Sequence, residues 1–120
     1  MASFTIDEEF RDGIHVLHAH GRITLGEGAS SLRDTVRELA DTGQARIILD
    51  LTDVAYVDSA GIGELVSAYT SITSGGGQFV LAGLQKRVSD LLQITKLYTV
   101  FSVYRTADEA IAALSAPSTT

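Results

Sequence analysis

A serine hydroxyl stands where a strand-like run gives way to a helix-like run. Ser59 follows the apolar stretch 46–51 and precedes a helical pattern that continues to about Ser74. The first turn of a helix has unpaired backbone N–H groups and the positive end of the helix dipole, so it suits negative charge. The fold would therefore tolerate a phosphate on Ser59. This position favours a phosphorylation switch over an enzyme.

The plainest structural role for the same serine is that of a helix N-cap, where alanine would cost about 1 kcal/mol. Two features favour a further role. Asp58 places a carboxylate beside the hydroxyl, which is more than a cap requires, and Ala60, Gly61 and Gly63 keep the start of the helix bare of large side chains. Glycine in place of alanine costs about 1 kcal/mol at each helical position. Close approach of another protein to this backbone would explain the two glycines.

Two glycine motifs match nucleotide-binding loops only in part. Gly-Ile-Gly at 61–63 follows a strand, but Val66 stands where a dinucleotide-binding fingerprint has its third glycine. The three glycines at 75–77 lack the Lys-Ser/Thr that follows in a phosphate-binding loop. We expect them to end a helix instead.

Three histidines share one predicted strand. His18 and His20 lie on the same face by the two-residue period, and His15 faces the other way. Two ligands without a third do not make a zinc site, so these residues are expected to be partly exposed strand histidines. No glycine-flanked nucleophile elbow surrounds Ser59, and the sequence places no histidine to activate it. No catalytic residue, metal site or cofactor is therefore expected.

The composition predicts one domain with an ordinary core. The chain has 120 residues, of which 45% are hydrophobic and 20% charged. We expect a single domain over residues 1–120, with its core at about 4–114 and a flexible tail at 115–120. There are no cysteines, which excludes disulfides, thiolate metal sites and cysteine nucleophiles.

Charge and hydropathy narrow the range of partners. The net charge is −6 and no Lys/Arg stripe stands out, which argues against nucleic acid or an anionic membrane and favours a partner with a basic surface. No signal-peptide pattern marks the start, and no apolar run nears the roughly 20 residues that cross a membrane. A cytoplasmic protein is expected, either a monomer or a weak dimer.

Strand and helix patterns alternate along the chain. Strands are expected at 4–10, 14–23, 45–51, 78–82 and 102–104, the first two forming a hairpin in which Gly21 marks a bulge or a close backbone approach. Helical spacing predicts helices at about 29–40, 59–74, 84–95 and after 106, where Thr106 and Glu109 fit a capping box. This order predicts an α/β fold: a mixed, mostly parallel sheet of four to five strands, preceded by a β-hairpin, with about four helices.

Taken together, these motifs resemble a STAS domain of the bacterial anti-sigma factor antagonist type. The resemblance covers nearly everything from residue 4 to 114. It rests on Gly21, the run Ile48-Leu49-Asp50-Leu51 leading to Val54, the motif Val57-Asp58-Ser59-Ala60-Gly61-Ile62-Gly63, the pair Gly75-Gly76, and Leu92, Ile94, Leu97 and Phe101.

The resemblance implies a partner-switching protein without enzymatic activity. In such proteins the unmodified antagonist captures a serine kinase that is also the anti-sigma factor, and the sigma factor is freed. The kinase then uses ATP to phosphorylate the serine after the aspartate, which is Ser59 here, and the antagonist is released until a serine phosphatase resets it. Partner contacts are expected from Asp58, Ser59, Ala60, Gly61, Gly63, Glu64 and Ser67.

The sequence departs from the family pattern at two places. Ala60 stands where the family often has Ser or Thr, so Ser59 is the only hydroxyl of the motif. Ile23-Thr24 stands where the family often has Leu-Asp, which weakens any claim for an acidic contact there.

Two other functions stay open at this stage. One is a STAS subunit of a larger assembly, such as a stress-sensing complex or a lipid-transport accessory, and stable co-purification with a multisubunit partner would favour it. The other is a small nucleotide-binding or hydrolytic enzyme, which ATP or GTP binding by the isolated chain would favour.

Overall fold

A computed structural model describes residues 4–115 and shows a five-stranded sheet with the strand order β1-β2-β3-β4-β5. β1 runs antiparallel to β2, and every other neighbouring pair is parallel. The predicted mixed, mostly parallel sheet is thus confirmed, with the hairpin forming part of it. The strands are β1 (Thr5–Arg11), β2 (Ile14–Ile23), β3 (Arg46–Val57), β4 (Gln78–Ala82) and β5 (Val103–Tyr104).

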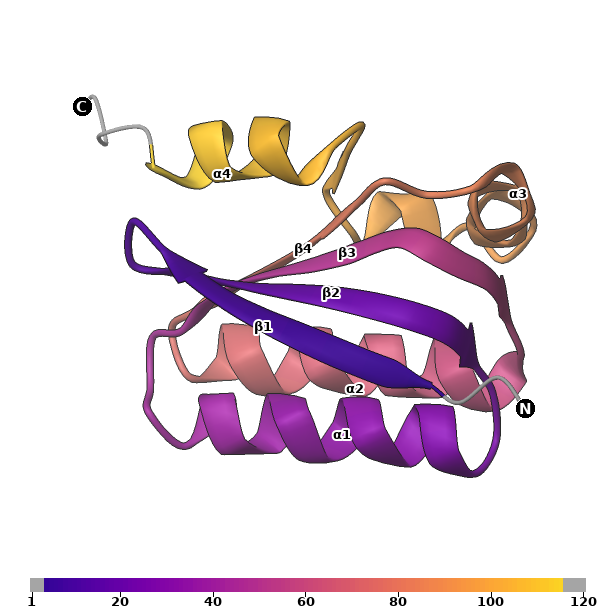
Figure 1. Ribbon diagram of the computed structural model, residues 1–120, viewed down its shortest axis with the longest axis horizontal. Coiled ribbons are helices and arrows are strands. Elements are labelled where there is room, and N and C mark those ends of the chain that lie inside the picture. The colour runs from indigo at the N-terminus through magenta and orange to yellow at the C-terminus, as the bar shows by residue number, and fades with distance from the viewer. Residues whose placement is uncertain (1–3, 116–120) are drawn as a thin grey trace.

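Helices cover both faces of the sheet (Figure 1). One face carries α1 (Glu27–Ala40) and α2 (Ser59–Ser74), which lie side by side. On the opposite side, α4 (Ala107–Ser115) and α3 (Lys86–Ile94) lie toward opposite ends, and the short 3-10 helix η1 (Leu97–Thr99) follows α3. Part of the sheet between α4 and α3 is therefore left without a helix over it.

Two apolar cores lie on the two faces of the sheet. The larger one joins the α1 and α2 stripes and the buried residues of α3 to β2, β3 and β4, and it includes Leu32, Leu49 and Leu65, all fully buried. The smaller one lies under α4, where Ile111 packs with Ile48 of β3 and with other residues of β2 and β4. The consecutive apolar run 47–49 is buried on both faces, as expected for a central strand.

The first hairpin and Gly21 are found as the sequence predicts. Asp12 and Gly13 both have positive φ, 56° and 77°, as the tight turn between β1 and β2 requires. Gly21 has a φ of 112°, and the pairing of β2 with β3 shifts register immediately after it. The predicted irregularity at Gly21 is thus a register shift that only a glycine accommodates without strain.

Two predicted boundaries and one terminal residue are wrong. β3 extends to Val57 and not to Leu51, because its second half pairs with the end of β2, with Ile23 opposite Val57. Helix α1 begins at Glu27, inside the expected loop, and Ser115 closes α4 and does not belong to a tail. The rest of that predicted tail, 116–120, lies outside the described residues, and the single-domain extent stays a prediction.

The capping box that opens α4 is confirmed. The backbone N–H of Glu109 donates to Thr106 Oγ1 at 3.1 Å. The glycines after α2 also behave as predicted, since the helix ends at Ser74 and Gly76 follows with a φ of 85°.

Candidate functional site at the start of helix α2

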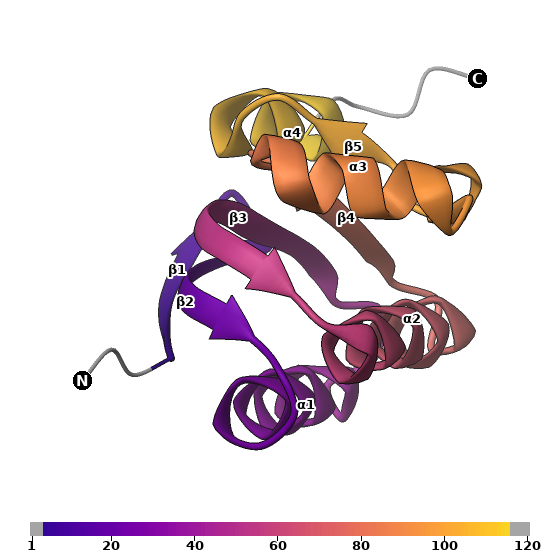
Figure 2. The ribbon, with the colours of Figure 1, turned by 90° about the vertical axis from the view of Figure 1, so that its right-hand side faces the viewer.

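The predicted motif lies at the end of the sheet where β2 leads into α1 and β3 leads into α2 (Figure 2). Asp58, and not Ser59, is the N-cap of α2: Asp58 Oδ1 accepts from the backbone N–H of Gly61 at 2.8 Å. The interpretation of Ser59 as a cap is therefore wrong. So is the view that the Asp58 carboxylate exceeds what a cap requires, because Asp58 supplies the cap itself.

Ser59 is the first residue of α2, and it is exposed. Among residues 4–115, the side-chain hydrogen bonds include none made by its hydroxyl, which is therefore not occupied in holding the fold together. The Asp58 cap frees the neighbouring serine from a structural task. The position combines an accessible hydroxyl with the positive end of a helix, as the sequence predicts.

Asp58 ties two loops together as well as capping the helix. Its second oxygen, Oδ2, accepts from the backbone N–H of Leu25 at 3.0 Å, in the connection between β2 and α1. The backbone N–H groups of Leu25 and Gly61 lower the pKa of the Asp58 carboxyl, because they stabilise its charged form. The carboxylate beside Ser59 is thus ionised and fixed in place.

Gly61 is glycine for an internal reason. It is buried, and a Cβ there would lie 2.6 Å from Val57 Cγ1 and well inside contact distance of the carbonyl oxygen of Ile23. That carbonyl also accepts from the backbone N–H of Asp58 at 3.2 Å, so it is held in place. The expectation that Gly61 leaves room for a partner is corrected here: it leaves room for the end of β2.

Gly63 differs from Gly61 in both respects. It is exposed, and a Cβ built on it would meet nothing within 4 Å. Nothing inside the molecule requires a glycine there, so close approach of a partner remains a prediction for this position. Ala60 is half-buried beside Ser59 and carries no hydroxyl.

Glu64 and Ser67 lie further along α2, on the side that faces α1. Glu64 Oε2 accepts from Arg33 Nε at 3.2 Å, and Ser67 is exposed in a shallow groove between the two helices. The arrangement links Glu64 to helix packing, while a partner contact by either residue stays a prediction.

Exposed apolar side chains from the β2–α1 connection, β3 and α3 lie around the motif. Leu25 is 81% exposed, Ile94 at the end of α3 is 79% exposed and Tyr56 of β3 is 40% exposed. The guanidinium of Arg87 lies 5.5 Å from the centre of the Tyr56 ring, and Arg87, Tyr56 and Ile94 line one hollow. We call Leu25, Tyr56, Arg87 and Ile94 the flanking surface.

Sequence reasoning missed most of the flanking surface, although two signals were present. Leu25 is a large apolar residue in a connection, and Ile94 lies off the apolar stripe of α3, whose buried members are Val88 and Leu92. Large apolar residues outside the core stripe indicate an interaction surface when several lie together.

The histidines lie elsewhere, on β2. His18 and His20 share one face, as predicted, and both are bonded to carboxylates of neighbouring strands. Within residues 4–115 no group of three or more His, Cys, Asp or Glu side chains has the geometry of a metal site. No helix in the same range is long and apolar enough to span a bilayer.

With this geometry established, comparison with known proteins defines the family. The STAS domain model matches residues 5–110. A Thermotoga neapolitana protein named as an anti-sigma factor antagonist is 36% identical over 74 residues, or 62% of this chain and 66% of that protein. The anti-sigma-B factor antagonist of Bacillus subtilis is 33% identical over 75 residues, or 62% of this chain and 68% of that protein.

A solved structure supports the same assignment. The crystal structure of a Thermotoga maritima protein assigned as an anti-sigma factor antagonist has a TM-score of 0.82 at 28% identity, and the match covers 90% of this chain and 92% of that one. The chain belongs to the STAS domain family, and relatives in it are named anti-sigma factor antagonists. The matched segments span about two thirds of the length of the two curated relatives.

Proposed function

We propose that this protein is an anti-sigma factor antagonist switched by phosphorylation of Ser59. In the unmodified state it binds an anti-sigma factor serine kinase, and the sigma factor is released. The kinase phosphorylates Ser59, the complex dissociates, and a serine phosphatase restores the starting state. The observation that carries the proposal is an exposed, uncommitted hydroxyl at the first position of α2, next to an aspartate that already caps the helix.

The surroundings of Ser59 suit a docking partner of mixed character. The flanking surface contributes apolar side chains and the Arg87 guanidinium, and the exposed Gly63 lets a partner approach the first turns of α2. An aliphatic residue such as Leu25, with 81% of its surface in water, gains most from being covered. Docking on this side would place Ser59 inside the interface.

The same location explains how a phosphate could release the partner without unfolding the protein. A phosphate carries roughly −1.5 to −2 charges, and a helix N-terminus tolerates it. At an interface that charge must be desolvated next to the fixed Asp58 carboxylate, and it adds bulk where contact had been close. A loss of about 3 kcal/mol of binding free energy weakens association more than 100-fold. Surface repulsion is enough, and no conformational change is needed.

The test combines phosphorylation with binding. The protein is incubated with the anti-sigma factor kinase of the same genome and Mg-ATP, and the modified residue is located by mass spectrometry. We expect one phosphate, on Ser59, and none on the variant Ser59→Ala. Binding of that kinase with ADP present should weaken at least about 100-fold for Ser59→Asp. Phosphate on another residue only, or unchanged binding by Ser59→Asp, would contradict the proposal.

A matched pair of variants examines the docking side. Leu25→Ser changes a side chain that is 81% exposed, and Gly63→Leu adds one where a Cβ meets nothing within 4 Å, so both variants should fold and both should weaken kinase binding. Leu25 donates only its backbone N–H to Asp58, which the substitution keeps. As a control, Phe10→Ser removes an apolar side chain that is 67% exposed and lies on β1, away from α2, and should leave binding intact.

A further inference from the structure

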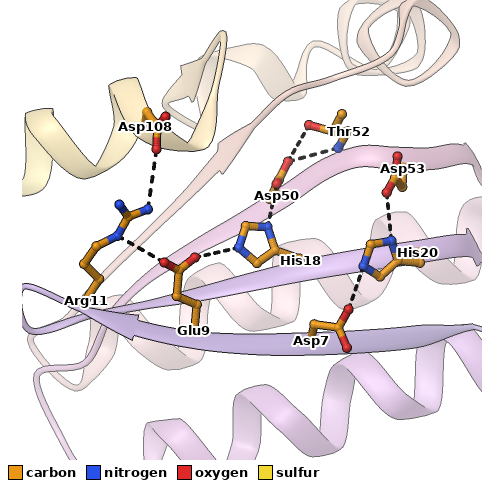
Figure 3. Close-up of polar contacts among 9 residues, drawn as sticks. All are labelled: Asp7, Glu9, Arg11, His18, His20, Asp50, Thr52, Asp53 and Asp108. Carbon is orange, nitrogen blue, oxygen red and sulfur yellow. Dashed lines mark hydrogen bonds and ion pairs between the residues drawn. The ribbon is translucent and has the colours of Figure 1, made fainter.

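His18 bridges two carboxylates on neighbouring strands (Figure 3). Its Nε2 lies 2.9 Å from Glu9 Oε1 of β1, and its Nδ1 lies 2.7 Å from Asp50 Oδ2 of β3. Asp50 also accepts from Thr52, through the backbone N–H at 3.1 Å and the hydroxyl at 2.6 Å, so the carboxylate is held in place.

His20 repeats this arrangement one step along the same face of β2. Its Nε2 lies 3.0 Å from Asp7 Oδ2 of β1, and its Nδ1 lies 2.8 Å from Asp53 Oδ2 of β3. Both rings therefore connect three strands, on the part of the sheet that no helix covers. The second bridge is the more exposed one, since 75% of the Asp7 side chain and 62% of the Asp53 side chain face water.

The number of protons on each ring decides how many of these contacts are attractive. A neutral imidazole has one N–H and one lone pair, whereas an imidazolium has two N–H donors. An ionised carboxylate only accepts. Each ring has a carboxylate oxygen at both nitrogens, so both contacts are hydrogen bonds only when the ring is doubly protonated. Loss of one proton turns one contact of each ring into a lone-pair repulsion.

Few other charges on this face can replace the missing protons. Arg11 of β1 pairs with Glu9 at 3.1 Å and with Asp108 of α4 at 3.4 Å. Lys86 and Arg87 of α3 are engaged with Asp90 and with the Tyr56 ring, and Arg22 lies two residues beyond His20 on β2 itself. With both imidazoles neutral, Glu9 would keep its ion pair with Arg11, and Asp7, Asp50 and Asp53 would lose the cations that they contact on this face.

Strand β1 depends on these contacts more than β3 does. β1 is an edge strand that pairs only with β2, and none of its seven residues is buried. β3 pairs on both sides, and its residues 47–49 are fully buried. An edge strand with little buried apolar surface opens at the lowest free-energy cost. The repulsion created by neutral rings should therefore loosen β1 first.

We propose that His18 and His20 form a clasp that holds β1 against the sheet and that is pH-sensitive through His18. The clasp is tight when the His18 ring is doubly protonated and loosens when that ring is neutral. The clasp is independent of the proposed function. All of its contacts are between residues of this protein, and it involves neither Ser59 nor a partner. It would give the N-terminal edge of the domain a response to pH across the physiological range.

The electrostatics of His18 agree with this geometry. Partial burial by itself lowers the pKa of His18, but the hydrogen bonds to Glu9 and Asp50 outweigh it and raise the pKa above the usual 6.5. A group with a raised folded-state pKa contributes stability that is fully present below its unfolded pKa and is lost as pH rises through the folded value. The pKa of Glu9 is lowered chiefly by the same hydrogen bond to His18.

Hydrogen exchange of the tag-free protein tests the clasp. Exchange rates of β1 amides bonded to β2 are measured at about pH 5.5 and 8.5 and corrected for the intrinsic pH dependence of exchange. We expect the protection of β1 amides to fall at least about tenfold at the higher pH, which corresponds to the loss of one charge-assisted hydrogen bond. The protection of β3 and β4 amides should change little. Equal protection of β1 at both pH values would overturn the proposal.

Two variants and one spectrum complete the experiment. The double variant His18→Gln/His20→Gln has no imidazole left between the carboxylates of β1 and β3, so its β1 protection should not change with pH. The matched control His15→Gln removes a ring of the same strand that lies tilted against the Phe10 ring, with 4.8 Å between the centroids, and it should keep the pH response. Imidazole nitrogen NMR of the unmodified protein needs no variant: His18 should be doubly protonated at pH 6.5. A neutral His18 at that pH, or an unaltered pH response in the double variant, would refute the clasp.

Discussion

Substituting alanine for Gly61 and for Gly63 should change the stability of the protein in opposite directions. At Gly61 the added Cβ would lie 2.6 Å from Val57 Cγ1 and would overlap the carbonyl oxygen of Ile23. That oxygen cannot rotate away, because it belongs to β2 and accepts from the N–H of Asp58. Overpacking costs about 1–3 kcal/mol, and a contact with fixed backbone falls at the upper end of that range. Alanine is favoured over glycine in a helix by about 1 kcal/mol, so the free energy of unfolding should fall by about 2 kcal/mol in all.

At Gly63 only the higher helix propensity of alanine changes the stability, because a Cβ there meets nothing within 4 Å. Gly63→Ala should therefore stabilise the protein by about 0.5–1 kcal/mol. Urea unfolding of the two variants and of the unmodified protein, with matched m values, measures both changes. If Gly61→Ala proved as stable as the unmodified protein, or Gly63→Ala lost stability, the reason given for the two glycines would be refuted.

Three further predictions concern caps and titration. Asp58→Ala removes the cap of α2 and the tie to Leu25, and it should lower the Tm by several degrees in thermal unfolding, whereas Asp58→Asn keeps one acceptor oxygen for the Gly61 N–H, loses the bond from Leu25 and should lower the Tm less. Because the folded-state pKa of Asp58 is lowered, its contribution is present above about pH 4 and is lost as pH falls, so Asp58→Asn should flatten the acid limb of a Tm–pH profile. Thr106→Ala should cost about 1 kcal/mol in urea unfolding, since Thr106 Oγ1 caps α4, and an unchanged midpoint would contradict that role.

Local patterns predicted most of the elements correctly. The turn at 12–13, the consecutive apolar residues 47–49 and the Thr106–Glu109 box are signals that act over a few residues, and the structure confirms all three. The second half of β3 was missed because its pairing partner is the end of β2, more than 30 residues earlier in the chain. A strand defined by such a distant neighbour shows no pattern of its own.

The site was predicted in position but not in detail. Aspartate and serine both cap helices well, so adjacent residues 58 and 59 could not be distinguished until the geometry showed which side chain bonds Gly61. The role of Gly61 depends on the carbonyl of Ile23, and the bridges of His18 and His20 depend on the register of three strands. Contacts of this kind arise from tertiary structure, and sequence spacing does not contain them.

The central claim is that the charge state of Ser59 governs partner binding without altering the fold. The most direct measurement compares the unmodified protein with protein carrying phosphoserine at position 59, each titrated calorimetrically into the anti-sigma factor kinase with ADP, alongside amide NMR spectra of both forms. We predict binding by the unmodified form, at least about 100-fold weaker binding by the phosphorylated form, and spectral changes confined to the surroundings of α2. Equal affinity of the two forms, or spectral changes throughout the sheet, would contradict the account.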